Sequence, residues 1–227
     1  MAHGRRLGFQ PSGGFIRKFK VVKLFEIKAI DKHSIWDGGK IMFKHIGSQT
    51  IETERLVLRK FTDGDVDDMY NNWASNPKIQ LEYGEPVYSM KEQVQELLDK
   101  WILNYSDESF YRWAIILKES NVNIGQIAFC RVYEEVATAE IEYCIGEDYW
   151  GSRYASEALN AVIEFMLLNS DFEKLEAFHR KANPKSGRVL EKTIMERVPI
   201  VRRFELSGEK PEGEICYAIT KEKYNKL

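Results

Sequence analysis

The order of its predicted elements assigns this 227-residue chain to the α/β class, with a mixed, mostly antiparallel central sheet of about seven strands flanked by helices on both faces. Two observations carry the prediction. Three β-rich runs joined by short turns predict an antiparallel meander. A later strand, helix and strand form a β-α-β unit, whose two strands should be parallel neighbours. The full order is β-α-α-β-β-β-α-β-α-β-β.

The first elements are a strand and two amphipathic helices. Apolar and charged side chains alternate over 51–59, which is typical of a half-exposed strand. Thr62 or Asp63 then caps a helix that carries its apolar residues on one face. Ser89 and Glu92 match a capping box and predict the start of a second helix.

The rest of the chain supplies six strands and two helices. The predicted strands are 111–118, 124–133, 138–145, 174–179, 199–205 and 214–220. The predicted helices are 154–169 and about 185–192. The strands at 138–145 and 174–179, with the long helix between them, form the β-α-β unit. The last two strands should flank a turn-rich segment as a hairpin that spans 199–213.

Composition and charge fit one globular domain. The chain is 44% hydrophobic and 30% charged, which suffices for one sizeable core. Residues 1–41 carry nine Lys or Arg against three Asp or Glu, so their charge is +6, whereas that of 42–227 is −8. An acidic body argues against nucleic-acid binding and favours an amine-bearing partner. Without a long apolar run or a signal peptide, we expect a cytoplasmic chain with no membrane partner.

Residues 1–41 show no sustained period of two or 3.6, so we expect an irregular N-terminal extension before a single domain at 42–227. One hypothesis is that this extension is a translated leader and that the natural start is Met42. The codons of Gly38 and Gly39 can spell GGAGG, a bacterial ribosome-binding core, at a short distance before Met42. The alternative is a basic arm for an acidic partner.

Cysteine and histidine usage excludes several kinds of site. Cys130, Cys144 and Cys216 lack CxxC spacing, so we interpret them as small buried hydrophobes and predict no metal site. Only His45 and His179 lie in the body, and no Gly-x-Ser-x-Gly elbow accompanies them. A Ser-His-Asp hydrolase is therefore not expected.

Two segments could carry chemistry. A glycine-containing turn, Trp150-Gly151-Ser152-Arg153-Tyr154-Ala155-Ser156, leads from the strand at 138–145 into the long helix. Successive amides at such a helix start can donate to an anion such as a pyrophosphate. The second segment is Asn183-Pro184-Lys185-Ser186, which is also a good helix start in its own right. Each segment therefore has a purely structural alternative.

From about residue 51 to the C-terminus, the chain resembles a GNAT acyl-CoA acyltransferase of the RimJ/RimL branch. The resemblance rests on the order of four pieces: Glu-Thr-Glu-Arg-Leu-Val-Leu-Arg at 52–59, Ile-Gly at 124–125, the turn, and the Asn-Pro-x-Ser helix. It implies a GNAT fold with a splayed parallel pair at strands four and five. It also implies transfer of acetyl from acetyl-CoA to a primary amine, on a protein N-terminus or a small molecule, by direct attack in a ternary complex. A homodimer is compatible with it.

The resemblance assigns roles to individual residues. Those implied to bind the cofactor are Cys144, Ile145, Trp150, Gly151, Ser152, Arg153, Tyr154, Ala155, Ser156 and Asn183. Ser186 is implied to donate a proton to the leaving thiolate. Glu140 matches a frequent acidic position, and Glu142 stands where glycine is usual. Either carboxylate could remove the amine proton, with Glu140 preferred, and for each the alternative is a structural role.

The chain departs from the family pattern at two positions. Arg153 replaces the central glycine of Gln/Arg-x-x-Gly-x-Gly/Ala, and Ile194 replaces the glycine that normally closes the later helix. Because Arg153 opens the long helix, we expect it to be helical. The alternative function is a catalytically impaired CoA-binding or protein-interaction module on the same scaffold. Acceptor recognition is expected from the first two helices and the 199–213 hairpin.

Overall fold

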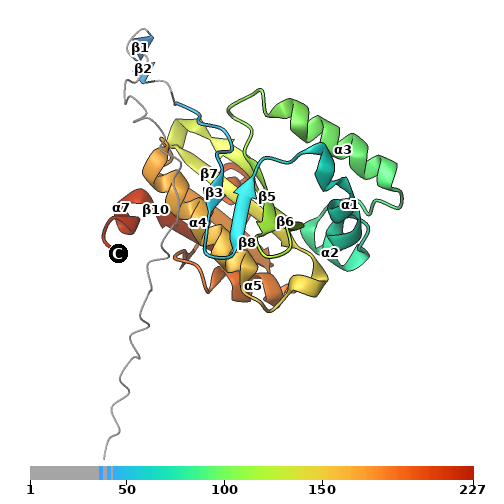
Figure 1. Ribbon diagram of the computed structural model, residues 1–227. Helices are drawn as coiled ribbons and strands as arrows, with labels where there is room; N and C mark the ends of the chain where they lie inside the picture. Colours follow the sequence, from blue (N-terminus) through green and yellow to red (C-terminus); the bar gives the residue numbers. More distant parts are fainter. Residues whose placement is uncertain (1–35, 38–39, 42) are drawn as a thin grey trace, which may run out of the picture.

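The computed structural model describes residues 36–37, 40–41 and 43–227 (Figure 1). Most of the segment 1–41 and the start proposed at Met42 lie outside the described residues. Two short strands, β1 (Trp36–Asp37) and β2 (Lys40–Ile41), pair with each other in antiparallel orientation.

The remaining strands form one eight-stranded sheet. They are β3 (Ile51–Glu52), β4 (Leu56–Arg59), β5 (Arg112–Leu117), β6 (Val122–Tyr133), β7 (Thr138–Ile145), β8 (Lys174–Arg180), β9 (Glu196–Val198) and β10 (Glu214–Thr220). Their order in the sheet is β3-β4-β5-β6-β7-β8-β10-β9. Every neighbouring pair is antiparallel except β7 and β8, which are parallel. The predicted mixed, mostly antiparallel α/β fold is confirmed.

Helices cover both faces of this sheet (Figure 1). They are α1 (Val66–Met69), α2 (Pro77–Tyr83), α3 (Lys91–Asn104), α4 (Tyr154–Asn169), α5 (Pro184–Leu190), α6 (Arg202–Ser207) and α7 (Lys221–Tyr224). Helices α1 to α3 pack on one face through their own apolar cluster, and α6 packs beside them over β8 and β10. The opposite face carries α4 and α5, which share the main core. Among the described residues, no helix has the length and hydropathy of a membrane span.

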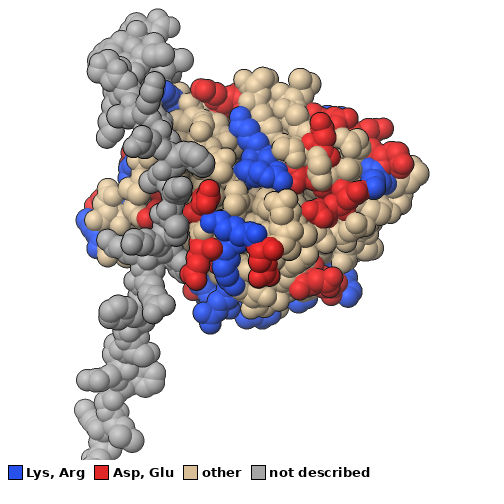
Figure 2. Space-filling view, viewed as in Figure 1, with Lys and Arg blue, Asp and Glu red and all other residues tan. Residues whose placement is uncertain are grey.

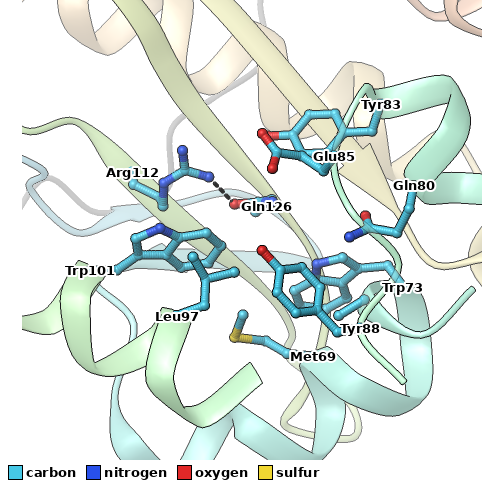
Figure 3. A pocket seen from close by; sticks show the side chains of 11 residues that line it. Met69, Trp73, Gln80, Tyr83, Glu85, Tyr88, Leu97, Trp101, Arg112 and Gln126 are labelled. Atoms are coloured by element: carbon cyan, nitrogen blue, oxygen red, sulfur yellow. Dashed lines mark hydrogen bonds between the residues drawn. The ribbon is translucent and has the colours of Figure 1, made fainter. Parts of the chain in front are cut away.

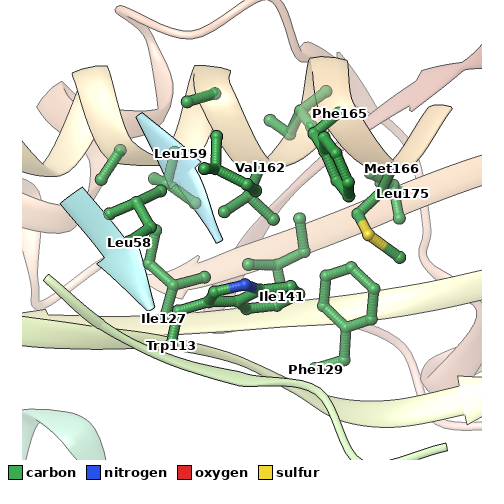
Figure 4. Close-up of a cluster of buried hydrophobic side chains, with 14 of the residues drawn as sticks. Leu58, Trp113, Ile127, Phe129, Ile141, Leu159, Val162, Phe165, Met166 and Leu175 are labelled. Carbon is green, nitrogen blue, oxygen red and sulfur yellow. The ribbon is translucent and has the colours of Figure 1, made fainter. Parts of the chain in front are cut away.

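The main core lies between α4 and the sheet (Figure 4). Val162, Phe165 and Met166 recur at helical spacing and point from α4 toward the sheet, whose Trp113 and Ile127 belong to the same cluster. All five are at most 3% exposed, and burying each such side chain contributes about 1.5–3 kcal/mol. This packing fixes α4 against the central strands of the sheet.

The parallel pair separates soon after it begins. The register joins Thr138 to Lys174, Ala139 to Leu175 and Glu140 to Glu176, and no pairing is recorded from 141 onward. Because β7 runs on to Ile145, its second half leaves an opening toward β8. The splayed pair that the resemblance implied is therefore present, and the opening connects the two faces of the sheet.

Close approach between β6 and β7 explains the Ile-Gly pair at 124–125. A Cβ atom on Gly125 would lie 2.3 Å from the carbonyl oxygen of Cys144. Real Cβ atoms do not come so close to backbone, so a side chain here would force β6 away from β7. Glycine at this position keeps the second half of β7 paired on its β6 side while its other side stays open.

The predicted strand at 199–205 is wrong, and so is the 199–213 hairpin. This segment contains α6 instead, and β9 at Glu196–Val198 takes the edge position. The backbone N–H of Arg202 donates to the Glu176 carboxylate at 2.7 Å, which fixes the first turn of the helix. Gly208 ends it in the left-handed conformation, with φ 71°.

The predicted first helix is broken into several pieces. A 3₁₀ turn at Asp63–Asp65 precedes α1, a π-helical turn at Tyr70–Ala74 follows it, and α2 then starts at Pro77 behind an Asn76 cap. The cap of α3 is also displaced by one residue from the prediction. The Gln93 side chain, rather than that of Glu92, accepts from the backbone N–H of Met90 at 3.2 Å.

Candidate active site

The turn at 150–156 is anchored by its first residue. The indole Nε1 of Trp150 donates to the carbonyl of Ile145 at 2.7 Å, which ties the turn to the end of β7. The six amides of 151–156 have no hydrogen-bond partner within the described part of the chain. Aligned free amides at the start of a 16-residue helix form a site for an anion.

Arg153 is not helical, which corrects the sequence-based expectation. Its φ is 67° and its ψ is 12°, the left-handed conformation, and Gly151 also has a positive φ of 80°. Arg153 is the N-cap of α4, so it precedes the helical residues instead of opening them. The turn needs two left-handed residues, and the family pattern places glycine at the second.

Helix α5 lies next to this turn. The ammonium of Lys185 is 3.9 Å from the centre of the Trp150 ring. The side-chain oxygen of Asn183 accepts from the backbone N–H of Ser186 at 3.1 Å, so Asn183 caps α5. Lys185 thus places a cation beside the turn, and Asn183 and Ser186 belong to the same helix start.

Tyr143 joins β7 to α5 across the opening. Its hydroxyl oxygen lies 2.7 Å from Oγ of Ser186 and donates to the Ser186 carbonyl at 3.1 Å. Burial raises the pKa of Tyr143 well above its usual range, so the phenol keeps its proton at neutral pH. Sequence reasoning missed Tyr143, because strand alternation placed it on the face opposite Glu142 but could not show that Ser186 lies on that face.

Glu140 lies on the other face of the sheet and is only 2% exposed. Its Oε1 accepts from Arg131 at 3.2 Å and from the Cys130 thiol at 3.2 Å, and Arg203 lies 3.5 Å away. Its Oε2 is buried and has no partner among the described residues. Glu140 is also the last residue of β7 that pairs with β8, so it lies where the opening begins.

Glu142 lies on the same face, beyond the last paired residue. Its Oε1 accepts from the Tyr83 hydroxyl at 2.7 Å and from Arg112 at 3.1 Å. The Arg112 guanidinium also donates to Gln126 and stacks on Trp101, with 4.2 Å to the ring centre. Glu142 is about a quarter exposed, in contrast to Glu140.

A cavity of about 110 Å³ lies beside Glu142, between α1, α2, α3 and the sheet (Figure 3). Its aromatic walls include Trp73, Tyr83, Tyr88 and Trp101, and Arg112 and Glu85 supply charges. Partial burial, and then the charge of Glu142, raises the pKa of Glu85, against the opposing charge of Arg112. Sequence reasoning missed Arg112 and Glu85, because these residues meet only in the folded chain.

The remaining predicted cofactor residues contribute in different ways. The carbonyl of Ile145 and the Oγ of Ser156 make backbone contacts that hold the turn, the latter by donating to Arg153 at 3.0 Å. The side chain of Cys144 packs in the apolar cluster under α1 to α3, away from the turn. Burial raises the pKa of Cys144 to about 12.

Charged groups elsewhere are mixed. Acidic and basic side chains are interspersed over the face shown in Figure 2. In the described part of the chain, no three His, Cys, Asp or Glu side chains are grouped so that they could hold a metal ion.

The site therefore has chemical groups on both faces of the sheet. On the α4 face, the turn amides and the Tyr143–Ser186 hydroxyl pair lie near the opening. On the α1–α3 face, the carboxylates of Glu140 and Glu142 lie along the same strand. The opening between β7 and β8 can hold an extended, anionic molecule, with a proton acceptor on one face of the sheet and a proton donor on the other.

Comparison with known proteins agrees with this geometry. Residues 55–196 match the acetyltransferase (GNAT) domain family, so the chain belongs to that family and is an acyltransferase. It is 27% identical to the uncharacterized N-acetyltransferase p20 of Bacillus licheniformis, over 78% of this chain and 98% of that protein.

Solved structures share the fold. A GNAT-family acetyltransferase from Bacillus anthracis is 25% identical, with a TM-score of 0.62, over 77% of this chain and 99% of that one. A putative ribosomal-protein-serine acetyltransferase from Vibrio cholerae is 21% identical, with a TM-score of 0.62, over 76% and 97%. The spermidine N-acetyltransferase of Vibrio cholerae, solved with CoA and spermine, is 18% identical, with a TM-score of 0.60, over 76% and 99%.

Proposed function

We propose that this chain transfers acetyl from acetyl-CoA to a primary amine by direct attack in a ternary complex. The observation that carries the proposal is the opening of β7 from β8 beyond Glu140, with six free amides of 151–156 at its end. The amides would receive the diphosphate of CoA, and the pantetheine arm would lie along the unpaired half of β7. Asn183 and Lys185 flank that path.

In the proposed reaction the amine nitrogen attacks the thioester carbonyl, a C–N bond forms and the C–S bond breaks. The amine proton passes to a carboxylate on the α1–α3 face, directly or through water. Glu140 is the preferred acceptor because one of its oxygens is unpartnered, and Glu142 is the alternative because it is more accessible. The thiolate takes a proton from the Tyr143–Ser186 pair.

Cysteine chemistry favours direct attack over an acyl-enzyme. A covalent route needs a thiolate, and desolvation raises the pKa of all three thiols. Cys144 and Cys216 are buried as predicted, but Cys130 is an exposed residue, which corrects the prediction for that position. None of these thiols is poised to act as a nucleophile at neutral pH.

The acceptor amine is proposed at the level of its class. Two of the solved relatives are named as a putative ribosomal-protein-serine acetyltransferase and a spermidine N-acetyltransferase, and both kinds of acceptor present an amine that is cationic in solution. The aromatic walls and the Glu85 carboxyl that lines the cavity suit such a group. A protein N-terminus, as in the RimJ/RimL branch, and a small amine are both retained as acceptors, and a cytoplasmic location is proposed with them.

Two measurements in sequence test the proposal. Calorimetric titration with acetyl-CoA should show binding, and release of free CoA should then accelerate with at least one member of a panel of peptides and polyamines. Binding without turnover on any amine would favour the alternative of a non-catalytic CoA-binding module. No binding at all would refute the proposed cofactor.

A further inference from the structure

Arg55 bridges the start of the sheet to the candidate cofactor turn. It lies between β3 and β4, and its Nε donates to Oε2 of Glu157 in the first turn of α4 at 2.7 Å. A second guanidinium nitrogen lies 2.6 Å from the same oxygen, and Nη1 donates to the carbonyl of Ser152 at 3.0 Å. The guanidinium also lies 4.4 Å from the centre of the Tyr154 ring.

These contacts determine where the turn amides point. In a trans peptide, the C=O and the following N–H point in opposite directions. Because the Ser152 carbonyl is directed at Arg55, the N–H of Arg153 is directed away from it. The Arg153 carbonyl in turn accepts from the N–H of Glu157 at 3.0 Å, so the N–H of Tyr154 is directed away from the helix. Both amides are thereby left without a partner in the described part of the chain and can donate to an anion.

Charge gives Arg55 a second role. Glu157 is only 7% exposed and lies near the amides that would hold a diphosphate, so its negative charge opposes an anion there. Thr53 donates to its Oε1 at 2.6 Å, and the backbone N–H of Arg55 does so at 3.1 Å. Only the Arg55 guanidinium, among the described residues, pairs with that charge.

We propose that Arg55 is a positioning residue for the diphosphate of the cofactor, because it orients the turn through Ser152 and neutralises Glu157. This inference rests on the proposed function, since it concerns the same turn. Arg55 would then differ from residues that touch the thioester. Its substitution should weaken binding only through the phosphate-bearing part of the ligand.

The test compares two ligands on the full chain. Acetyl-CoA carries the diphosphate, whereas S-acetylpantetheine carries the same thioester arm without it. Arg55→Met should weaken acetyl-CoA binding about ten- to a hundredfold, and S-acetylpantetheine binding by less than about twofold. Arg55→Lys keeps the charge without the planar guanidinium, so its affinity for acetyl-CoA should lie between that of the parent and that of Arg55→Met.

Arg59→Met is the matched control. Arg59 is the last residue of β4, four positions after Arg55, and makes a similar two-pronged pair with Asp65, at 2.8 and 2.9 Å, away from the turn. This variant should leave the ratio of the two affinities unchanged. Equal weakening of both ligands by Arg55→Met would make Arg55 merely structural and overturn the inference, as would no weakening of either. A parent that binds S-acetylpantetheine but not acetyl-CoA would overturn the proposed cofactor itself.

Discussion

The hydroxyl oxygens of Tyr143 and Ser186 lie 2.7 Å apart, one on the open half of β7 and the other on α5. Because either oxygen can donate, the pair can pass a proton toward the sulfur of a bound thioester. We expect Ser186→Ala to lower kcat roughly ten- to a thousandfold, the usual range for loss of a general acid or a key donor. Cofactor affinity, measured by calorimetry, should barely change. Unaltered turnover would reduce Ser186 to a residue of the helix start.

Tyr143→Phe tests whether Ser186 donates the proton alone or acts as one unit with Tyr143. If the two hydroxyls act as one unit, Tyr143→Phe should reduce kcat to a similar degree, and the double variant should lose little more. Steady-state rates of the four proteins give the coupling. Losses that multiply in the double variant would show that the hydroxyls act independently.

The pH dependence of the rate distinguishes Glu140 from Glu142. The acceptor ammonium, with a pKa of about 10.4, must lose a proton before attack, so the rate should rise with pH. When Glu140→Gln and Glu142→Gln are measured separately, only one of the two variants should flatten that rise of the rate with pH. If neither profile changes, the amine loses its proton to solvent, and both carboxylates are structural.

Glu85 offers a test that does not depend on turnover. Burial and then the charge of Glu142 raise its pKa, so it keeps its proton to a higher pH than a free carboxyl group does. Removing the Glu142 charge with Glu142→Gln should therefore lower the pKa of Glu85 toward its ordinary value. A carbon-detected NMR titration of the glutamate carboxyls measures this shift. An unchanged titration would mean that the two carboxyls are not coupled across the cavity.

The elements that the sequence predicts best are those with strong local signals. The bounds of β7 and α4 agree with the predicted 138–145 and 154–169, because a meander turn and a long apolar stripe mark them. The prediction of a strand at 199–205 is wrong because this segment lacks a strong local signal. Its helix, α6, is fixed by the carboxylate of Glu176, which lies on β8 and precedes Arg202 by 26 residues in the sequence.

The site follows the same division. The turn and the Asn183 cap are contiguous motifs and could be found in the sequence. The pairing of Arg55 with Glu157 joins residues 102 apart, and the cavity draws Arg112 and Glu85 from different elements. No local pattern reports such contacts. The conformation of Arg153 is a different case, since its position beside a helix favoured a helical φ and only the turn around it imposes the left-handed one.

Arg153→Gly tests the strain in that turn. A left-handed non-glycine residue costs about 1–2 kcal/mol, and glycine loses roughly 0.5–1 kcal/mol more chain freedom on folding. The first effect is the larger, so Arg153→Gly should raise the free energy of unfolding by about 0.5–1 kcal/mol, measured by denaturant titration. Arg153→Ala keeps the Cβ atom and should bring no such gain.

The same variants measure what Arg153 does to the cofactor. Its guanidinium has no ion-pair partner in the part of the chain that the structure describes, so its charge is available to a CoA phosphate. That attraction opposes the bulk of the side chain at a position where the family has glycine. We therefore expect parent affinity for acetyl-CoA within about tenfold of that of Arg153→Gly, and a steeper loss of parent affinity with salt. Calorimetric titrations at two salt concentrations decide, with Arg153→Ala as the uncharged control. If the parent shows no binding of acetyl-CoA and Arg153→Gly restores it, the Arg153 side chain blocks the site. The chain would then be a protein of the same fold that no longer binds acetyl-CoA.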